Sequence, residues 1–496
     1  MSAPVLMETA RRFRNGLIER PYASLAVLCL LICPFFDRIN PNDAAALMAG
    51  GLLVLCVSAV CLHARGRLTH RRLILLLVAA GVLLRIGYAL YTPYGVRQHD
   101  AGIFGGEGGH AGYIGYIADH LALPHTNAPW QFYHPPLHHT VSGLWLWLNL
   151  SAGVPAEAAY ENIQLLTAFY SCAAILICYG VFRELKLSRR ATAFALAIVC
   201  FHPTFIILAG SINNDMLWVL FYLAALLFAI RWYREPSMKN VLCLAVCTGL
   251  AMMAKLSAVT IAPVIAFVFL VKLWKERKRA KKLFGRIGAF CLVSVPLGVW
   301  YPVRNLLLFQ QPLSYVPELG KTFQYVGNYG IADRLWNIPW SQLGVPYQSL
   351  ETGYNIPLSL MKTATFGESE MTVGAPANIL LYVHILLAVV ALFAMVRMLI
   401  RKDGEKAVLN RALGLAWIVL MASYVIFCLD FPSVCSEDFR YVVPTLLIGT
   451  VFFAQLLDGL RNGSKWKKGC ARAIECAVLL FCVFSAVVYV ALGVAG

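Results

Sequence analysis

The stretch that decides the fold is residues 73–100, which read LILLLVAAGVLLRIGYALYTPYGVRQHD. Residues 73–91 are apolar apart from Arg85 and a few small or tyrosine residues, and a helix of that length crosses a hydrocarbon layer of about 30 Å. The apolar part is followed by a short polar segment that ends in His99 and Asp100. The stretch therefore predicts a membrane-spanning helix with ionisable residues just beyond its end.

The same apolar pattern recurs along the whole chain. The sequence is 59% hydrophobic with a mean hydropathy of +0.68, which is more apolar surface than one water-soluble core could bury. About thirteen runs are long enough to span a bilayer. They are residues 22–36, 44–62, 73–91, 157–182, 191–209, 215–233, 240–254, 257–273, 286–302, 377–399, 411–430, 441–459 and 473–494. We expect an all-α polytopic membrane protein.

The net charge is +17, but the basic residues are spread over separate loops and do not form a nucleic-acid-binding patch. Basic residues fall in alternate loops, such as 65–72, 183–190 and 275–282, which the positive-inside rule assigns to the cytoplasm. We therefore expect a multi-pass plasma-membrane protein with a cytoplasmic N-terminus. The loops on the external side would be residues 37–43, 92–156, 210–214, 303–376 and 431–440.

Two of these external loops are long enough to carry function. In loop 92–156, residues His110, Ile114, Ile117 and Leu121 recur at helical spacing, which predicts a short interfacial helix. A second such helix is expected from Pro135-Pro136 onward. We divide the chain into an accessory hairpin (1–72), a transmembrane core with the first long loop (73–302), an external cap (303–376) and C-terminal helices (377–496).

Ionisable residues of chemical interest gather in the first long loop. Seven of the eleven histidines lie between His99 and His139, together with Asp100 and Glu107. Histidines and carboxylates in one place can bind a divalent metal ion or move protons near neutral pH, although any single histidine could equally be ordinary loop polarity. Asp100 follows the predicted helix by only about nine residues and so lies close to the membrane surface, where a carboxylate could act as a general base.

Several cations lie near the external surface. Arg304 and Arg440 are placed to bind a lipid phosphate through the bidentate guanidinium fork. Arg85 and Lys255 are either functional or simply snorkelling towards water. The segment 211–215 (SINND) could touch a substrate or could only cap the following helix.

Short motifs resemble those of a known enzyme class. They are LLRI (83–86), HD (99–100), HPPL (134–137), INND (212–215), AKLS (254–257), WYPVRN (300–305) and FRYVVP (439–444). In this order they resemble the C-type membrane glycosyltransferases (GT-C), especially the bacterial relatives of protein O-mannosyltransferases and of the aminoarabinose transferase. The resemblance runs from about Leu73 to Phe453 and implies a GT-C-like fold.

The resemblance implies a function and assigns roles to residues. A sugar would pass from a polyprenyl-phosphate donor to an acceptor on the external face, with inversion at the anomeric carbon. Asp100 would be catalytic, and Glu107 is a candidate second acid because Ala101 stands where many relatives have an acidic neighbour.

The remaining site residues concern the donor phosphate and a metal ion. Arg304, Arg440 and Lys255 would bind the donor phosphate. His99, His110, His134 and His138 are candidate ligands for a divalent metal ion or for the acceptor. Membrane lipids are expected partners, and nucleic acid is not. The alternatives are a transporter or flippase of a lipid-linked substrate, or an O-antigen ligase or polymerase type of enzyme.

Overall fold

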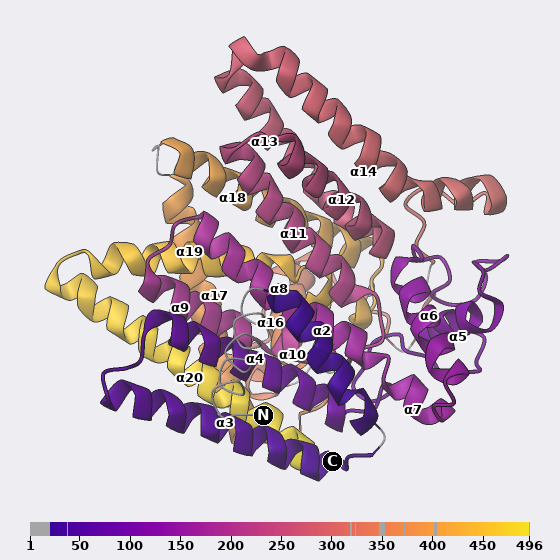
Figure 1. Ribbon diagram of the computed structural model, residues 1–496, viewed down its shortest axis with the longest axis horizontal. Coiled ribbons are helices and arrows are strands. Elements are labelled where there is room, and N and C mark those ends of the chain that lie inside the picture. Colours follow the sequence, from indigo (N-terminus) through magenta and orange to yellow (C-terminus); the bar gives the residue numbers. More distant parts are fainter. Residues whose placement is uncertain are drawn as a thin grey trace, which may run out of the picture.

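The computed structural model describes residues 20–36, 38–317, 320–322, 324–346, 353–371, 373–400 and 404–495. Within these residues there are helices and no β-strand, apart from one isolated bridge between Tyr325 and Ser433. Figure 1 shows long helices side by side, with the short helices α5, α6 and α7 grouped at one flank. The expected all-α polytopic fold class is confirmed.

The α-helices occupy the following ranges. They are α2 Pro21–Ile32, α3 Pro41–Ala64, α4 His70–Tyr91, α5 Gly109–His120, α6 Leu137–Ser151, α7 Ala156–Glu161, α8 Gln164–Glu184, α9 Arg189–Phe201, α10 Pro203–Ile207, α11 Asp215–Arg234, α12 Met238–Ala254, α13 Ala262–Lys275, α14 Ala280–Phe309, α15 Ile331–Leu335, α16 Ile356–Phe366, α17 Ala375–Leu399, α18 Gly404–Asp430, α19 Pro444–Arg461 and α20 Lys465–Ala495. The 3₁₀ turns that matter for the site are η2 Leu208–Gly210, η3 Leu256–Ile261, η6 Val434–Ser436 and η7 Phe439–Tyr441.

Every predicted apolar run is largely helical, but the count of thirteen spans is not confirmed. The described part of the chain has nine helices long and apolar enough to cross a membrane, or up to eleven if each of two bent pairs is one span. The bent pairs are Arg189–Phe201 with Pro203–Gly210 (50°) and Val434–Tyr441 with Pro444–Arg461 (52°). The runs 22–36 and 240–254 form the shorter helices Pro21–Phe35 and Met238–Ala254. Hydropathy detects apolar runs, but it does not show where a proline bends a helix or whether the straight part of the helix is long enough to cross a membrane.

Arg85 explains how one of these breaks is stabilised inside the protein. Pro203 has no N–H, so the carbonyls near the end of α9 lose helical partners. The fully buried guanidinium of Arg85 donates to the Val199 oxygen at 3.0 Å and to the Cys200 oxygen at 2.7 Å. It also donates to the Ser171 hydroxyl at 2.9 Å. Arg85 therefore does not snorkel; it satisfies carbonyls that would otherwise be buried and unpaired.

Loss of this arginine should destabilise the fold. In Arg85→Met, two buried carbonyls lose their donors, at a cost of about 1–3 kcal/mol each. We expect a clearly lower thermal unfolding temperature of the detergent-solubilised protein. Arg71→Met, an exposed arginine near the start of the same helix, is the matched control. Equal unfolding temperatures for the two variants would contradict this role.

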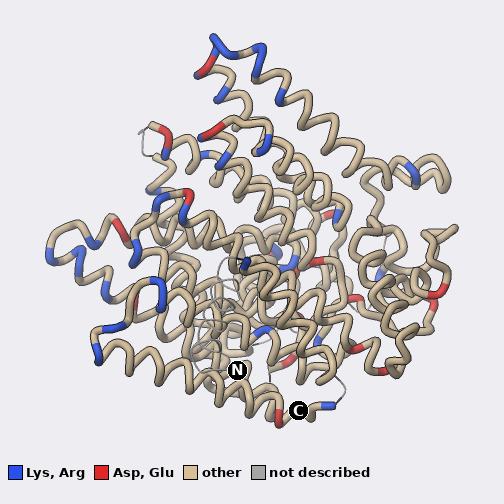
Figure 2. Tube along the Cα trace, viewed as in Figure 1, with Lys and Arg blue, Asp and Glu red and all other residues tan. Residues whose placement is uncertain are grey.

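The two short helices expected in the first long loop are present. α5 begins at Gly109 and α6 begins directly after Pro135-Pro136, and the two pack against each other. Their inner face is protein rather than lipid, because Tyr113, Ile114 and Ile117 of α5 are all buried. Figure 2 shows lysine and arginine gathered at the hairpin ends away from α5–α7. This distribution agrees with the alternation of basic loops in the sequence.

Candidate active site

Four interruptions between helices meet around one group of ion pairs. They are the loop after α4, the segment before α11, the turn between α12 and η3, and the η6–η7 segment before α19. The Asn214 side-chain amide donates to the Ala254 carbonyl at 2.8 Å and so joins the second interruption to the third. Residues that are far apart in the sequence are thereby placed around one polar centre inside an apolar protein.

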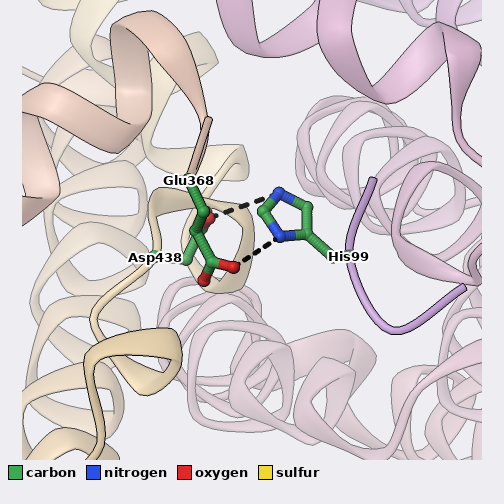
Figure 3. A group of neighbouring side chains, drawn as sticks. All are labelled: His99, Glu368 and Asp438. Atoms are coloured by element: carbon green, nitrogen blue, oxygen red, sulfur yellow. Dashed lines mark hydrogen bonds and ion pairs between the residues drawn. The ribbon is translucent and has the colours of Figure 1, made fainter. Parts of the chain in front are cut away.

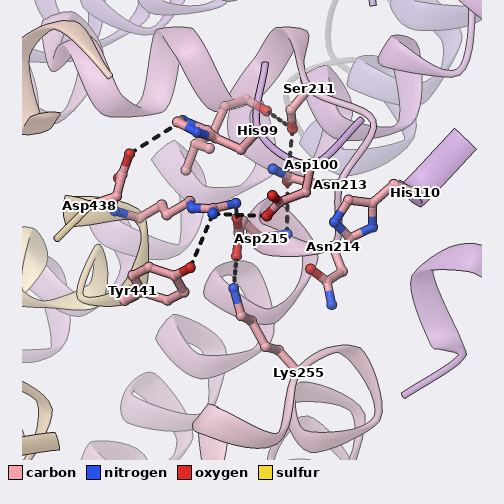
Figure 4. A network of polar contacts seen from close by, with 12 residues as sticks. His99, Asp100, His110, Ser211, Asn213, Asn214, Asp215, Lys255, Asp438 and Tyr441 are labelled. Atoms are coloured by element: carbon pink, nitrogen blue, oxygen red, sulfur yellow. Dashed lines mark hydrogen bonds and ion pairs between the residues drawn. The ribbon is translucent and has the colours of Figure 1, made fainter. Parts of the chain in front are cut away.

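Four charged side chains form this centre, which we call the ion cluster: Asp100, Asp215, Lys255 and Arg440. Figure 4 labels the first three of them. Arg440 lies 2.9 Å from an Asp100 carboxylate oxygen and 3.5 Å from an Asp215 oxygen. The Lys255 ammonium pairs with the other Asp215 oxygen. Two positive and two negative charges balance, as buried ionisable groups near a membrane require.

The backbone of the first loop aims Asp100 at this cluster. Asp100 has φ +55°, a left-handed conformation that aspartate and asparagine tolerate better than most residues. Its carbonyl accepts from the His110 N–H at 3.0 Å, so the loop folds back onto the start of α5. Gly109, at φ +78°, makes this approach possible, since a Cβ there would lie 2.6 Å from the Gly102 Cα. The glycines of this loop thus have a structural role, since they let the loop pack closely against the start of α5.

A cavity of about 470 Å³, the donor cavity, opens beside the cluster. Its polar end carries Asp100, Lys255 and Arg440, whereas Asp215 lies behind the two cations and is not part of the wall. The rest of the wall is largely apolar. One side of it comes from α12, η3, α14 and α18, and the other side includes the first long loop and residues 313–316. The residues that define this apolar side are Met252, Leu256, Val259, Val299, Pro302, Leu420 and Phe427. The cavity therefore suits an amphiphile with an anionic head.

A second polar group lies next to the cluster and holds the same loops together. His99 lies 3.0 Å from a Glu368 oxygen through Nδ1 and 3.4 Å from an Asp438 oxygen through Nε2 (Figure 3). Among the described residues, these three have the spacing of a metal site, with ligand atoms within 4.8 Å of one another. His99 directly precedes Asp100, and the Asp438 carboxylate accepts from the Arg440 N–H at 2.6 Å. This triad, which we call the His99 triad, therefore braces the Asp100–Arg440 pair.

The triad should respond to pH when no metal is present. Both ring nitrogens face carboxylates, and only the protonated imidazolium has two N–H donors. Burial alone would lower the pKa of His99, but the Glu368 and Asp438 carboxylates outweigh it and raise the pKa. A raised folded-state pKa stabilises the fold below the unfolded value of about 6.5, and this stability is lost as pH rises through the folded value.

We therefore expect the unfolding temperature of chelator-treated protein to fall between pH 6 and pH 9 by more in wild type than in His99→Gln. Glutamine keeps a polar side chain but does not titrate. An identical pH profile for the two proteins would show that His99 does not act as a charged bridge.

Four other histidines of the loop, His110, His134, His138 and His139, pack against one another in a histidine stack, whereas His120 and His125 are exposed. His110 Nδ1 lies 2.8 Å from His139 Nε2, and His138 Nε2 donates to the Ile212 carbonyl at 2.8 Å. Burial lowers the pKa of His110, His134 and His139, and it lowers the pKa of His138 to about 4. The stack is thus neutral near pH 7. His110 and His134 line the donor cavity, whereas His138 is fully buried outside its wall.

Two residues expected at the site lie elsewhere. Glu107 is exposed and does not line the donor cavity. Arg304 also lies outside its wall; its guanidinium donates to the Pro124 carbonyl at 2.7 Å and so holds the first long loop to the end of α14.

The structure also adds residues that the sequence did not mark as part of the site. Asp215 appeared only as a residue that could cap a helix or touch substrate, and Glu368 and Asp438 were not singled out. The sequence offered two signals: Asp215 is an acidic residue at the start of an apolar run, and Asp438 lies two positions before Arg440.

Comparisons with known proteins concern the fold and one region of the sequence. A family model described as dolichyl-phosphate-mannose-protein mannosyltransferase matches residues 139–309. ArnT from Cupriavidus metallidurans in its apo state aligns with a TM-score of 0.50 and 12% identity, over 85% of this chain and 76% of ArnT. The ArnT structure bound to undecaprenyl phosphate aligns with a TM-score of 0.50 and 13% identity over the same shares.

A third solved structure is more distant. The Archaeoglobus fulgidus oligosaccharyltransferase complex with Zn and sulfate aligns with a TM-score of 0.47 and 13% identity, over 83% of this chain. The match covers 53% of that protein, so the chain spans about half its length. No curated protein matches the sequence. Residues 139–309 thus resemble the dolichyl-phosphate-mannose-protein mannosyltransferase family, and the chain has a fold similar to that of ArnT. The predicted resemblance to C-type membrane glycosyltransferases is confirmed.

Proposed function

We propose that this protein is an inverting glycosyltransferase that takes a sugar from a polyprenyl-phosphate donor and passes it to an acceptor on the external face of the membrane. The observation that carries the proposal is the pairing of Asp100 with Arg440 at the polar end of a cavity that is otherwise largely apolar. The family match names a dolichyl-phosphate sugar enzyme, and ArnT has been solved with undecaprenyl phosphate bound.

The isoprenoid chain and the phosphate of the donor each match a different part of the donor cavity. The isoprenoid chain would lie along the apolar wall formed by α12, α14 and α18, and the phosphate would lie against Lys255 and Arg440. Asp215 holds both cations from behind, so it is a positioning residue that keeps them at the wall. Charge-assisted contacts to phosphate are among the stronger hydrogen bonds in proteins.

In the reaction, Asp100 accepts the proton of the acceptor hydroxyl. The hydroxyl oxygen forms a bond to the anomeric carbon from the face opposite the phosphate, and the bond from that carbon to the phosphate oxygen breaks. The electron pair leaves with the polyprenyl phosphate, whose added charge is stabilised by Arg440 and Lys255. The neutral histidines His110 and His134 line the same wall and are available as hydrogen-bond partners for the sugar.

We also propose that the His99 triad binds a divalent cation. The donor set of one imidazole and two carboxylates suits zinc or manganese. One buried carboxylate oxygen, Glu368 Oε1, has no hydrogen-bond partner and could accept a metal bond. Such an ion would supply positive charge beside Asp100 and Arg440 and hold their loops together.

Replacing Asp100 by asparagine should abolish sugar transfer without unfolding the protein. Asparagine has the same shape and tolerates the left-handed backbone at this position, so the loop is preserved. Loss of a general base predicts a fall in turnover of about 100-fold or more. Radiolabelled transfer from purified polyprenyl-phosphate sugars measures it. Asp119→Asn, an exposed acid on α5, is the matched control, and near-normal turnover in Asp100→Asn would refute the assignment.

The metal proposal predicts about one equivalent of bound zinc or manganese per chain, measured by elemental analysis after loading and desalting. His99→Gln and Glu368→Gln should each reduce this content strongly, because each removes one of three ligands. Glu370→Gln, an exposed acid two residues from Glu368, should retain it. Metal content that is negligible in wild type, or equal in all variants, would leave the triad as an ion bridge.

A further inference from the structure

We infer that a second cavity, on the other side of Tyr133 and Tyr315 from the donor cavity, binds the acceptor, and that the acceptor presents an uncharged carbohydrate there. This inference rests on the proposed glycosyltransferase function and deepens it, because it names the chemical class of the acceptor. The observations come from the shape, charge and hydrogen bonding of this second cavity, which we call the acceptor cavity.

The acceptor cavity has a volume of about 480 Å³ and lies between the first long loop and the end of α14. Its described lining residues include Asn127, Trp130, Tyr133, Phe309, Gln311 and Tyr315. Tyr133 and Tyr315 line both cavities, and their rings meet edge to face with centroids 6.0 Å apart. A ligand that extends past these two tyrosines would reach the donor cavity, which Asp100 also lines.

None of the described residues that line the acceptor cavity is acidic, basic or histidine. A phosphorylated or carboxylated ligand would leave its charge without a partner in such a site, which is unfavourable. The donor cavity differs, because its wall contains Lys255 and Arg440. The absence of charge therefore favours a neutral ligand over an anionic lipid headgroup.

Aromatic and amide groups in the wall suit the two kinds of surface on a sugar. Trp130 is 44% exposed, and with Tyr133, Phe309 and Tyr315 it offers ring faces for the C–H faces of a pyranose. The Asn127 amide donates to Gln311 at 3.0 Å, while Asn127 Oδ1 is buried without a hydrogen-bond partner. Asn127 is 7% exposed, so this oxygen is a buried acceptor that a ligand hydroxyl could satisfy.

The walls of the acceptor cavity are held in place before any ligand binds. Arg304 donates to the Pro124 carbonyl at 2.7 Å and lies over the Phe309 ring at 5.4 Å, so it ties the loop to α14. The Trp130 carbonyl accepts from the Gly109 N–H at 2.9 Å, which fixes the tryptophan through its backbone. In this arrangement Arg304 positions the acceptor cavity.

Trp130 allows a direct test, because replacing its side chain leaves the backbone anchor intact. The probes are neutral oligosaccharides, such as a trisaccharide of glucose and one of N-acetylglucosamine, and a neutral serine-rich peptide. Binding to the full-length protein is measured by ligand-observed NMR, and transfer is measured with a polyprenyl-phosphate sugar. Trp130→Ala should weaken oligosaccharide binding about tenfold, whereas Trp130→Phe should largely retain it because stacking remains possible.

Two controls separate this inference from the proposed function. Trp336→Ala removes an exposed tryptophan that lies outside both cavities, and it should bind the oligosaccharide like wild type. Slow hydrolysis of the donor by water, measured without acceptor in wild type and in Trp336→Ala, reports on the donor cavity alone and should be equal in the two proteins. Absence of donor hydrolysis in wild type would refute the proposed function.

The acceptor assignment itself has distinct contradicting outcomes. Donor hydrolysis accompanied by no binding of either trisaccharide would overturn the carbohydrate assignment. Binding of the peptide alone would overturn it in favour of a protein acceptor. Oligosaccharide binding that is equal in wild type and Trp130→Ala would show that the ligand lies elsewhere.

Discussion

The ion cluster of Asp100, Asp215, Lys255 and Arg440 is the interaction on which the rest of the site depends. Asp215 and Arg440 are almost completely buried, and removing one partner would leave a charge with no counterion in an apolar surrounding. Because the four residues come from four separate interruptions between helices, their mutual pairing also fixes those interruptions relative to one another. One balanced set of charges thus shapes both the fold around these interruptions and the wall of the donor cavity.

Polar groups inside this apolar protein are found where helices are broken. At the α9–α10 break, Arg85 satisfies the carbonyls that Pro203 leaves free. At the α12–η3 turn, the Ala254 carbonyl accepts from Asn214, and the next residue, Lys255, turns towards Asp215. Irregular backbone at membrane depth is tolerated only where protein or a polar cavity satisfies it. The two breaks use the same principle, one for stability and the other for the site.

The sequence predicted the class of fold and part of the site. Asp100, Lys255 and Arg440 were selected by charge near the ends of apolar runs and by motif order, and the structure brings all three to one cavity. Asp215 resembled an ordinary residue at a helix start, because sequence does not show that two distant cations converge on it. Glu368 follows a helix about 270 residues after His99, and such a contact has no local pattern. The count of thirteen spans is not confirmed, because apolar composition alone does not reveal a 50° bend or a short helix in the described residues.

The central claim is that Lys255 and Arg440 receive the donor phosphate while Asp100 faces the sugar. An experimental structure of the full-length protein with a non-hydrolysable polyprenyl-phosphate sugar analogue tests it most directly. The account predicts phosphate oxygens within about 4 Å of both cations, the isoprenoid chain along α12, α14 and α18, and Asp100 on the opposite face of the anomeric carbon. A phosphate bound at Arg304, or anywhere outside the donor cavity, would contradict it.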